Sequence, residues 1–140
     1  MRKLIILLFL LIQGCALHCS AMQDVYTIYE VSFPNPHTHY VEVSIHFKGL
    51  PADSFEVIMP VWIPGSYMVR EFSKNVEGFR AYNPQQQLVS FKKVSKNVWR
   101  IYNDSITALS VSYRFYAFDL SVRTCFVDTD HAYLNGPALY

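Results

Sequence analysis

Hydrophobic and polar residues alternate along much of the chain with a period of two. The clearest runs place apolar side chains at every second position, from Val41 to Phe47 and from Leu109 to Ala117. Weaker alternation covers residues 25–33, 55–61, 88–94 and 98–102. Because successive side chains of a strand point to opposite faces, each run buries one face of a sheet and exposes the other. We therefore expect an all-β single domain of sandwich-like antiparallel sheets.

Turn-forming residues separate these runs. They lie at residues 49–53, at Asn83-Pro84 and at residues 103–105, while Lys96-Asn97 has the length of a tight hairpin loop. The one helix that we expect is short and lies around residues 69–74. Ten Tyr, ten Phe and two Trp would fill the core of a sandwich with large side chains.

The first 21 residues resemble a secretory signal peptide. Arg2 and Lys3 precede an apolar run from Leu4 to Ile12, which is shorter than the roughly 20 residues that a membrane-spanning helix needs. Two processing routes are open. Cleavage after Ala21 would leave residues 22–140, whereas a lipobox at residues 12–15 would make Cys15 a lipidated N-terminus. Both routes predict an exported protein, periplasmic or secreted in the first case and a membrane-anchored lipoprotein in the second.

The charge of the processed chain gives no reason to expect a nucleic-acid partner. After removal of Arg2 and Lys3, the number of basic residues falls from 12 to 10 against 11 acidic residues. The basic residues between Lys92 and Arg100 fit a solvated hairpin. If Cys15 and Cys19 leave with the signal, Cys125 stands alone, and we expect it to be a small residue of the core.

Motifs for catalysis are missing from the chain. It has neither the H-E-x-x-H pattern of zinc hydrolases nor a G-x-S-x-G nucleophile elbow, and its five glycines form no phosphate loop. Cys125 and His131 lack the spacing of a known Cys–His pair. His37 and His39 form an H-x-H pair, but zinc would need further ligands such as Asp128 or His131, so a place in a turn is the favoured interpretation. We expect neither catalytic nor metal-binding residues in this chain.

Two segments carry more polar and aromatic residues than a simple strand requires. The first, residues 59–72, combines prolines, glycine and aromatic residues into a rigid loop that ends in Arg70 and Glu71. The second, residues 121–136, contains a set of polar side chains and closes with an Asn-Gly turn. Three interpretations are open for the candidate residues: an internal Arg–Asp network that joins the loops, a surface that docks a partner domain, or a direct contact with substrate. The candidates are Arg70, Glu71, Arg123, Asp128, His131 and Asn135.

Three blocks of sequence resemble the glycyl aminopeptidase family of bacterial metallopeptidases. They are residues 33–40 (FPNPHTHY), residues 60–72 (PVWIPGSYMVREF) and residues 121–136, which begin with SVRT and end with LNG. The resemblance covers nearly all of the chain after the signal segment and is limited to the N-terminal domain of that family.

The resemblance implies a sandwich-like N-terminal domain beside a thermolysin-like catalytic domain that binds zinc and removes N-terminal Gly or Ala from peptides. No catalytic or zinc-binding position of that family has a counterpart here. We therefore expect the non-catalytic N-terminal domain of an exported zinc metalloaminopeptidase, with a missing C-terminal peptidase domain as its partner. The apolar end at residues 137–140 is consistent with a chain that is cut short.

Two other functions remain open. The chain could be a free-standing β module that binds peptides or glycans through residues 62–67, or a truncated remnant without activity. Neither alternative changes the expected fold.

Overall fold

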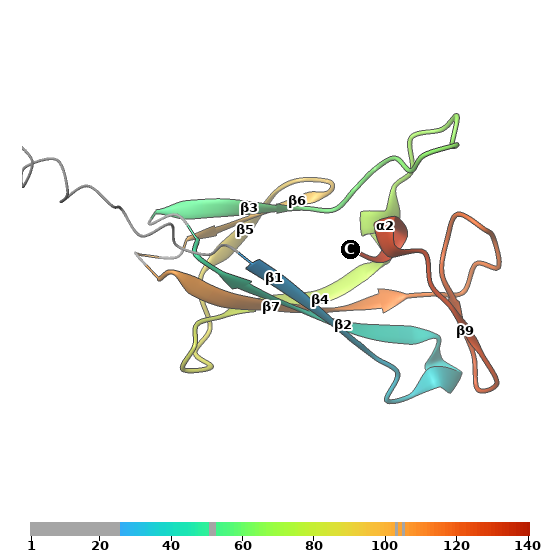
Figure 1. Cartoon of the computed structure of the whole chain (residues 1–140), viewed down its shortest axis with the longest axis horizontal. Coiled ribbons are helices and arrows are strands. Elements are labelled where there is room, and N and C mark those ends of the chain that lie inside the picture. Colours follow the sequence, from blue (N-terminus) through green and yellow to red (C-terminus); the bar gives the residue numbers. More distant parts are fainter. Residues whose placement is uncertain (1–25, 51–52, 103, 105) are drawn as a thin grey trace, which may run out of the picture.

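The structure is a computed structural model that describes residues 26–50, 53–102, 104 and 106–140. Two antiparallel sheets form its layers (Figure 1). The predicted signal segment and Cys15 lie outside the described residues. Within those residues, no helix is long and apolar enough to cross a membrane.

The first sheet has four strands in the order β1-β2-β7-β4. Its strands are β1 (Tyr26–Ser32), β2 (Tyr40–Lys48), β7 (Ala108–Tyr116) and β4 (Val76–Tyr82). The two central strands, β2 and β7, pair over nine residues, from Tyr40 opposite Tyr116 to Lys48 opposite Ala108. Every second side chain of both strands is buried or half-buried and faces the core, as the alternation predicts.

The second sheet has three strands in the order β3-β6-β5. These are β3 (Ser54–Ile58), β6 (Val98–Tyr102) and β5 (Phe91–Ser95), and the β5–β6 connection at residues 96–97 is the predicted hairpin turn. A two-stranded ribbon of β8 (Phe126–Val127) and β9 (Ala132–Tyr133) lies at one end of the molecule (Figure 1). The expected all-β fold with antiparallel sheets is confirmed.

Aromatic rings join the two sheets. Phe79 of β4 stacks on Trp99 of β6, with ring centroids 4.9 Å apart and planes 9° apart. Phe79 also contacts Phe91 of β5 and Tyr113 of β7. Stacked aromatic pairs contribute about 0.5–1.5 kcal/mol beyond the burial of their surface, so this group is a main contact between the layers.

Strand β4 was not predicted from the alternation. A register shift lies between Glu77 and Arg80, where Gly78 adopts a φ of +62°. This bulge places Val76 and Phe79 against the same core although they are three residues apart. The period of two is therefore broken at the point where the strand contributes its largest core side chain.

The prediction of a helix around residues 69–74 was wrong in extent. The structure has a 3-10 helix, η2 (Phe72–Asn75), while the backbone N–H of Arg70 donates across the preceding loop to the carbonyl of Val61. That hydrogen bond holds residue 70 outside a helix. A second 3-10 helix, η1 (Pro36–Thr38), joins β1 to β2.

The last described helix, α2 (Gly136–Leu139), lies between the two sheets (Figure 1). Ala138 and Leu139 are fully buried there, and the hydroxyl of Tyr113 donates a 2.7 Å hydrogen bond to the carbonyl of Leu139. The ring of Tyr140 stacks on Tyr29 of β1 at 4.6 Å. Residues far apart in sequence thus complete the core at this end.

We expect Tyr113→Phe to lower the free energy of unfolding by about 1–2 kcal/mol, because it leaves the buried carbonyl of Leu139 without a donor. Denaturant unfolding measures the change. Tyr116→Phe on the exposed face of the same strand is the control and should have little effect. Equal losses in both variants would contradict the role of the Tyr113–Leu139 hydrogen bond.

Candidate functional site

A rigid loop, residues 60–71, projects from one end of the sandwich between β3 and η2 (Figure 1). Pro64 and Gly65 occupy the centre of a tight turn, in which the N–H of Ser66 donates to the carbonyl of Ile63. Gly65 has a φ of +79°, as the third residue of a type II turn requires. The indole N–H of Trp62 donates to the carbonyl of Ser66 at 2.7 Å, so the turn is held by a side chain as well.

Buried residues fix the base of this loop while its tip faces outward. Ile63 and Phe72 belong to the hydrophobic core, and the buried Ser66 hydroxyl bonds to the backbone of Met68. At the tip, Tyr67, Met68 and Val69 are exposed, Tyr67 completely. The loop therefore presents apolar side chains from a fixed backbone.

A second loop, residues 117–135, lies at the same end of the molecule (Figure 1). Two hydrogen bonds join it to His39, in the connection between β1 and β2. The backbone N–H of Ala117 donates to the carbonyl of His39, and Nδ1 of His39 donates to the carbonyl of Val127 at 2.7 Å. His39 has a φ of +63° at the end of η1, and its ring lies 3.9 Å from that of Phe118. His39 is therefore a structural link between η1 and the second loop.

The His37–His39 pair does not present two ligands on one side. The segment is a 3-10 helix rather than an extended strand, His37 is exposed, and Nδ1 of His39 is engaged by Val127. In the described part of the chain, no group of three or more His, Cys, Asp or Glu side chains gathers in a way that could hold a metal ion.

Asn135 and Cys125 hold the end of the second loop. The side-chain amide of Asn135 donates to the carbonyl of Val122 at 3.0 Å, and its backbone N–H lies 3.4 Å from Sγ of Cys125. Burial raises the pKa of the Cys125 thiol, which keeps it in the unreactive protonated form. The expectation that Cys125 is a core residue is confirmed by its burial.

Asp128 organises the turn between β8 and β9. Its Oδ1 accepts hydrogen bonds from the backbone N–H groups of His131 at 2.8 Å and Asp130 at 2.9 Å, and the ring of His131 lies 3.2 Å away. These backbone hydrogen bonds, that of His131 first, lower the pKa of the Asp128 carboxyl. Asp128 and His131, two of the predicted residues, are thus brought together within one turn.

The other charged candidates do not complete an Arg–Asp network. Glu71 forms an ion pair with Lys96 of the β5–β6 turn at 2.5 Å, and this pairing was not predicted from the sequence. Among residues 26–140 that the structure describes, no ion pair involves Arg70 or Arg123, and none joins the two loops. Nε of Arg70 is buried without a hydrogen-bond partner. The internal-network interpretation is therefore not supported.

Exposed apolar side chains of both loops lie at this end of the molecule, and we call them the loop-end surface. Buried residues and backbone hydrogen bonds hold both loops, and Arg70 and Arg123 lie in the same segments. Sequence reasoning missed most of these residues because single exposed apolar residues carry no motif. The surface consists of Trp62, Tyr67, Met68, Val69, Leu120, Val122 and Tyr133.

Gly65→Ala should destabilise the protein by about 1–2 kcal/mol. A Cβ at this position meets no atom within 4 Å, so the cost arises from the positive φ alone. Thermal or denaturant unfolding measures the loss. Gly65→Asn should recover part of it, because Asn tolerates this conformation better than Ala. If Asn and Ala behave alike, strain at the turn is not the cause.

The turn at Asp128 should loosen at acidic pH. Because the folded-state pKa of this carboxyl is lowered, its stabilising effect is present above the unfolded-state pKa and is lost as the pH falls through the folded-state pKa. Hydrogen exchange of the Asp130 and His131 amides should accelerate over that range. Asp128→Asn should abolish the pH dependence, whereas the neighbouring Asp130→Asn should retain it.

Two comparisons with known proteins identify relatives of this chain. Residues 28–140 match the Peptidase M61 N-terminal domain family. The structure is similar to the crystal structure of an aminopeptidase N family protein from Idiomarina loihiensis, with a TM-score of 0.76 and 32% sequence identity. The match covers 82% of this chain but only 19% of that protein. No curated protein matches the chain. By fold and by sequence, the chain belongs to the Peptidase M61 N-terminal domain family.

Proposed function

We propose that this chain is the non-catalytic N-terminal domain of an exported zinc metalloaminopeptidase of the glycyl aminopeptidase type, and that its loop-end surface docks against the catalytic domain. Membership of a peptidase N-terminal domain family supports this proposal. So does the similarity to an aminopeptidase family protein that is about five times as long as the matched part. Export rests on the signal-like residues 1–21.

The observation that carries the docking proposal is the gathering of exposed apolar side chains on two fixed loops. Soluble monomers rarely leave large contiguous apolar patches open to water, and such patches commonly mark interfaces. Trp62 and Tyr67 are of the residue types that contribute most energy to interfaces. Because the turn at Gly65 and the Asn135 hydrogen bonds already fix the loops, little conformational entropy would be lost on docking.

Arg70 adds a polar component to this surface. Arg70 is half-buried in the first loop and forms no ion pair among the described residues, so a carboxylate of a docked domain would give its guanidinium group a partner. Arg123 is half-buried in the second loop and also lacks an ion pair among the described residues. The predicted residues Arg70 and Arg123 are therefore the ones that we assign to polar contacts with the partner.

Zinc belongs to the catalytic domain in this proposal. The described residues of this chain do not provide a set of ligands for it, so no catalytic step is assigned to them. The purified chain alone should release no glycine or alanine from peptides, with or without added zinc.

The docking proposal can be tested in a chimera in which this chain replaces the matching domain of the Idiomarina loihiensis relative. The double variant Tyr67→Ser/Val69→Ser should separate the unfolding of the two domains and lower hydrolysis of glycyl and alanyl peptides by about tenfold or more. The same two substitutions should leave the stability of the isolated chain nearly unchanged, because both side chains are exposed there. Calorimetry and peptide hydrolysis are the measurements.

Lys92→Ser, on the exposed strand β5 away from both loops, is the matched control and should change neither measurement. If the parent chimera unfolds as two independent transitions, or if the double variant behaves as the control does, the loop-end surface is not the docking site. A free-standing binding module or an inactive remnant would then account better for the chain.

A further inference from the structure

The outer face of the four-stranded sheet, which points away from the core, carries a row of polar side chains, three serines and one histidine, along its two central strands. Ser44 and His46 project from β2, and Ser112 and Ser110 lie directly opposite them on β7. Their neighbours on the outer strands are larger. Ile28 and Glu30 of β1 flank one side, and Tyr82 and Arg80 of β4 flank the other. Small residues between large ones make a trough, which we call the serine trough.

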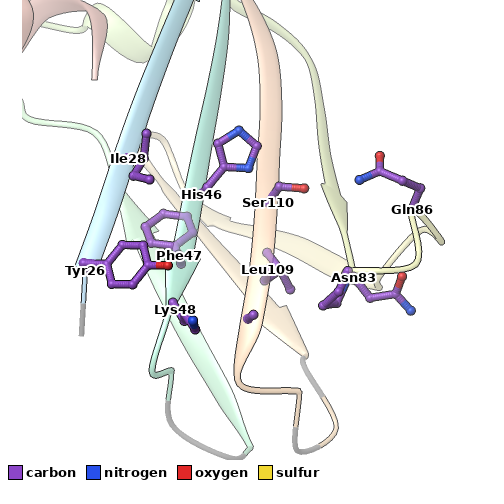
Figure 2. Close-up of a pocket in the computed structure, with 11 residues that line it drawn as sticks. Tyr26, Ile28, His46, Phe47, Lys48, Asn83, Gln86, Leu109 and Ser110 are labelled. Atoms are coloured by element: carbon purple, nitrogen blue, oxygen red, sulfur yellow. The ribbon is translucent and has the colours of Figure 1, made fainter. Parts of the chain in front are cut away.

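Two hollows on this face of the sheet lie along the trough. One, of about 220 Å³, lies against His46 and Ser110, and the other, of about 360 Å³, lies against Ser44 and Ser112. Figure 2 shows the first hollow, with Tyr26 and Ile28 of β1 on one side of His46 and Ser110, and Asn83 and Gln86 of the β4–β5 turn on the other. The two hollows share no lining residue and follow one another along β2 and β7, so together they extend along the strands for about 20 Å, the length of six residues.

The floor of the serine trough holds hydrogen-bonding groups that the protein does not use. All four side chains are half-buried, and within the described structure the three serine hydroxyls have no hydrogen-bond partner. His46 is the exception, because its Nε2 lies 3.3 Å from a carboxylate oxygen of Glu30 on the neighbouring strand. The three serine hydroxyls therefore remain free to donate to and accept from a ligand that enters the trough.

We propose that the serine trough binds a neutral oligosaccharide that lies along β2 and β7. Hydroxyl and imidazole groups both donate and accept hydrogen bonds, as sugar hydroxyls do, and the amide of Gln86 adds a further donor and acceptor at one end. Tyr82 supplies aromatic surface at one edge, against which the C–H face of a pyranose ring can pack, while the ring of Tyr26 at the other edge has Lys48 over one of its faces at 5.5 Å. This site is separate from the loop-end surface and does not depend on the docking proposal.

The charges of the trough favour a neutral ligand over an anionic one. Three basic residues at its margins, Arg80, Lys48 and Arg114, are matched by three acidic ones, so no excess of positive charge surrounds the floor. The acidic residues are Glu30, Glu42 and Glu77, of which Glu77 pairs with Arg114 at 3.3 Å. An extended peptide is also disfavoured, because the backbone groups of the central strands are already paired on both sides and only side chains face the trough.

The test measures binding of neutral hexasaccharides of glucose, xylose, mannose and N-acetylglucosamine to the purified protein by titration calorimetry. We expect at least one of them to bind, and Ser112→Phe, which fills the middle of the trough, to weaken that binding about tenfold or more. Tyr82→Ala, which removes one wall without filling the floor, should also weaken it. Thermal unfolding of each variant establishes that it is folded.

Ser95→Phe is the matched control, since it makes the same substitution at an exposed strand position of the other sheet. It should bind as the unaltered protein does. Absence of binding to all four hexasaccharides overturns the proposal, and so does binding that Ser112→Phe and Tyr82→Ala leave intact. Binding of charged oligosaccharides alone, with uronic acid probes in the same assay, would overturn the assignment of a neutral ligand.

Discussion

The packing of Phe79 between the two sheets is the contact on which the domain most depends. Its ring lies parallel to Trp99 on the opposite layer and close to Tyr113 on its own, and both of those residues are buried. The bulge at Gly78 turns this side chain inward. Without that local irregularity, β4 would present its large residue to water and the layers would lose their central aromatic contact.

The alternation of apolar and polar residues predicted the central strands correctly because their pattern is regular. β2 and β7 bury one face and expose the other over nine residues each, so local pattern and tertiary environment agree. It failed at β4, where the bulge makes the inward spacing three rather than two. The short helix expected around residues 69–74 begins only at Phe72, because the N–H of Arg70 is bonded to the carbonyl of Val61. In both places a contact distant in sequence overrides the local preference.

The candidate residues were predictable in part for the same reason. Asp128 and His131 were correctly placed in one loop, since the turn that joins them is local. The pairing of Glu71 with Lys96 depends on how the two sheets stack and could not be read from spacing. The serine trough could not be predicted from the sequence. Ser44, Ser110 and Ser112 are ordinary polar positions of half-buried strands, and only the register of β2 against β7 places them side by side.

The burial of α2 between the sheets has a consequence for the order of events during synthesis. Ala138 and Leu139 fill the core, and Tyr113 has its hydrogen-bond acceptor only when Leu139 is present. A nascent chain that ends a few residues earlier would therefore have both sheets but an open seam between them. β2 can pair with β7 only after some 70 further residues have been synthesised. We therefore expect the domain to fold late in synthesis and in one step, rather than strand by strand from its N-terminus.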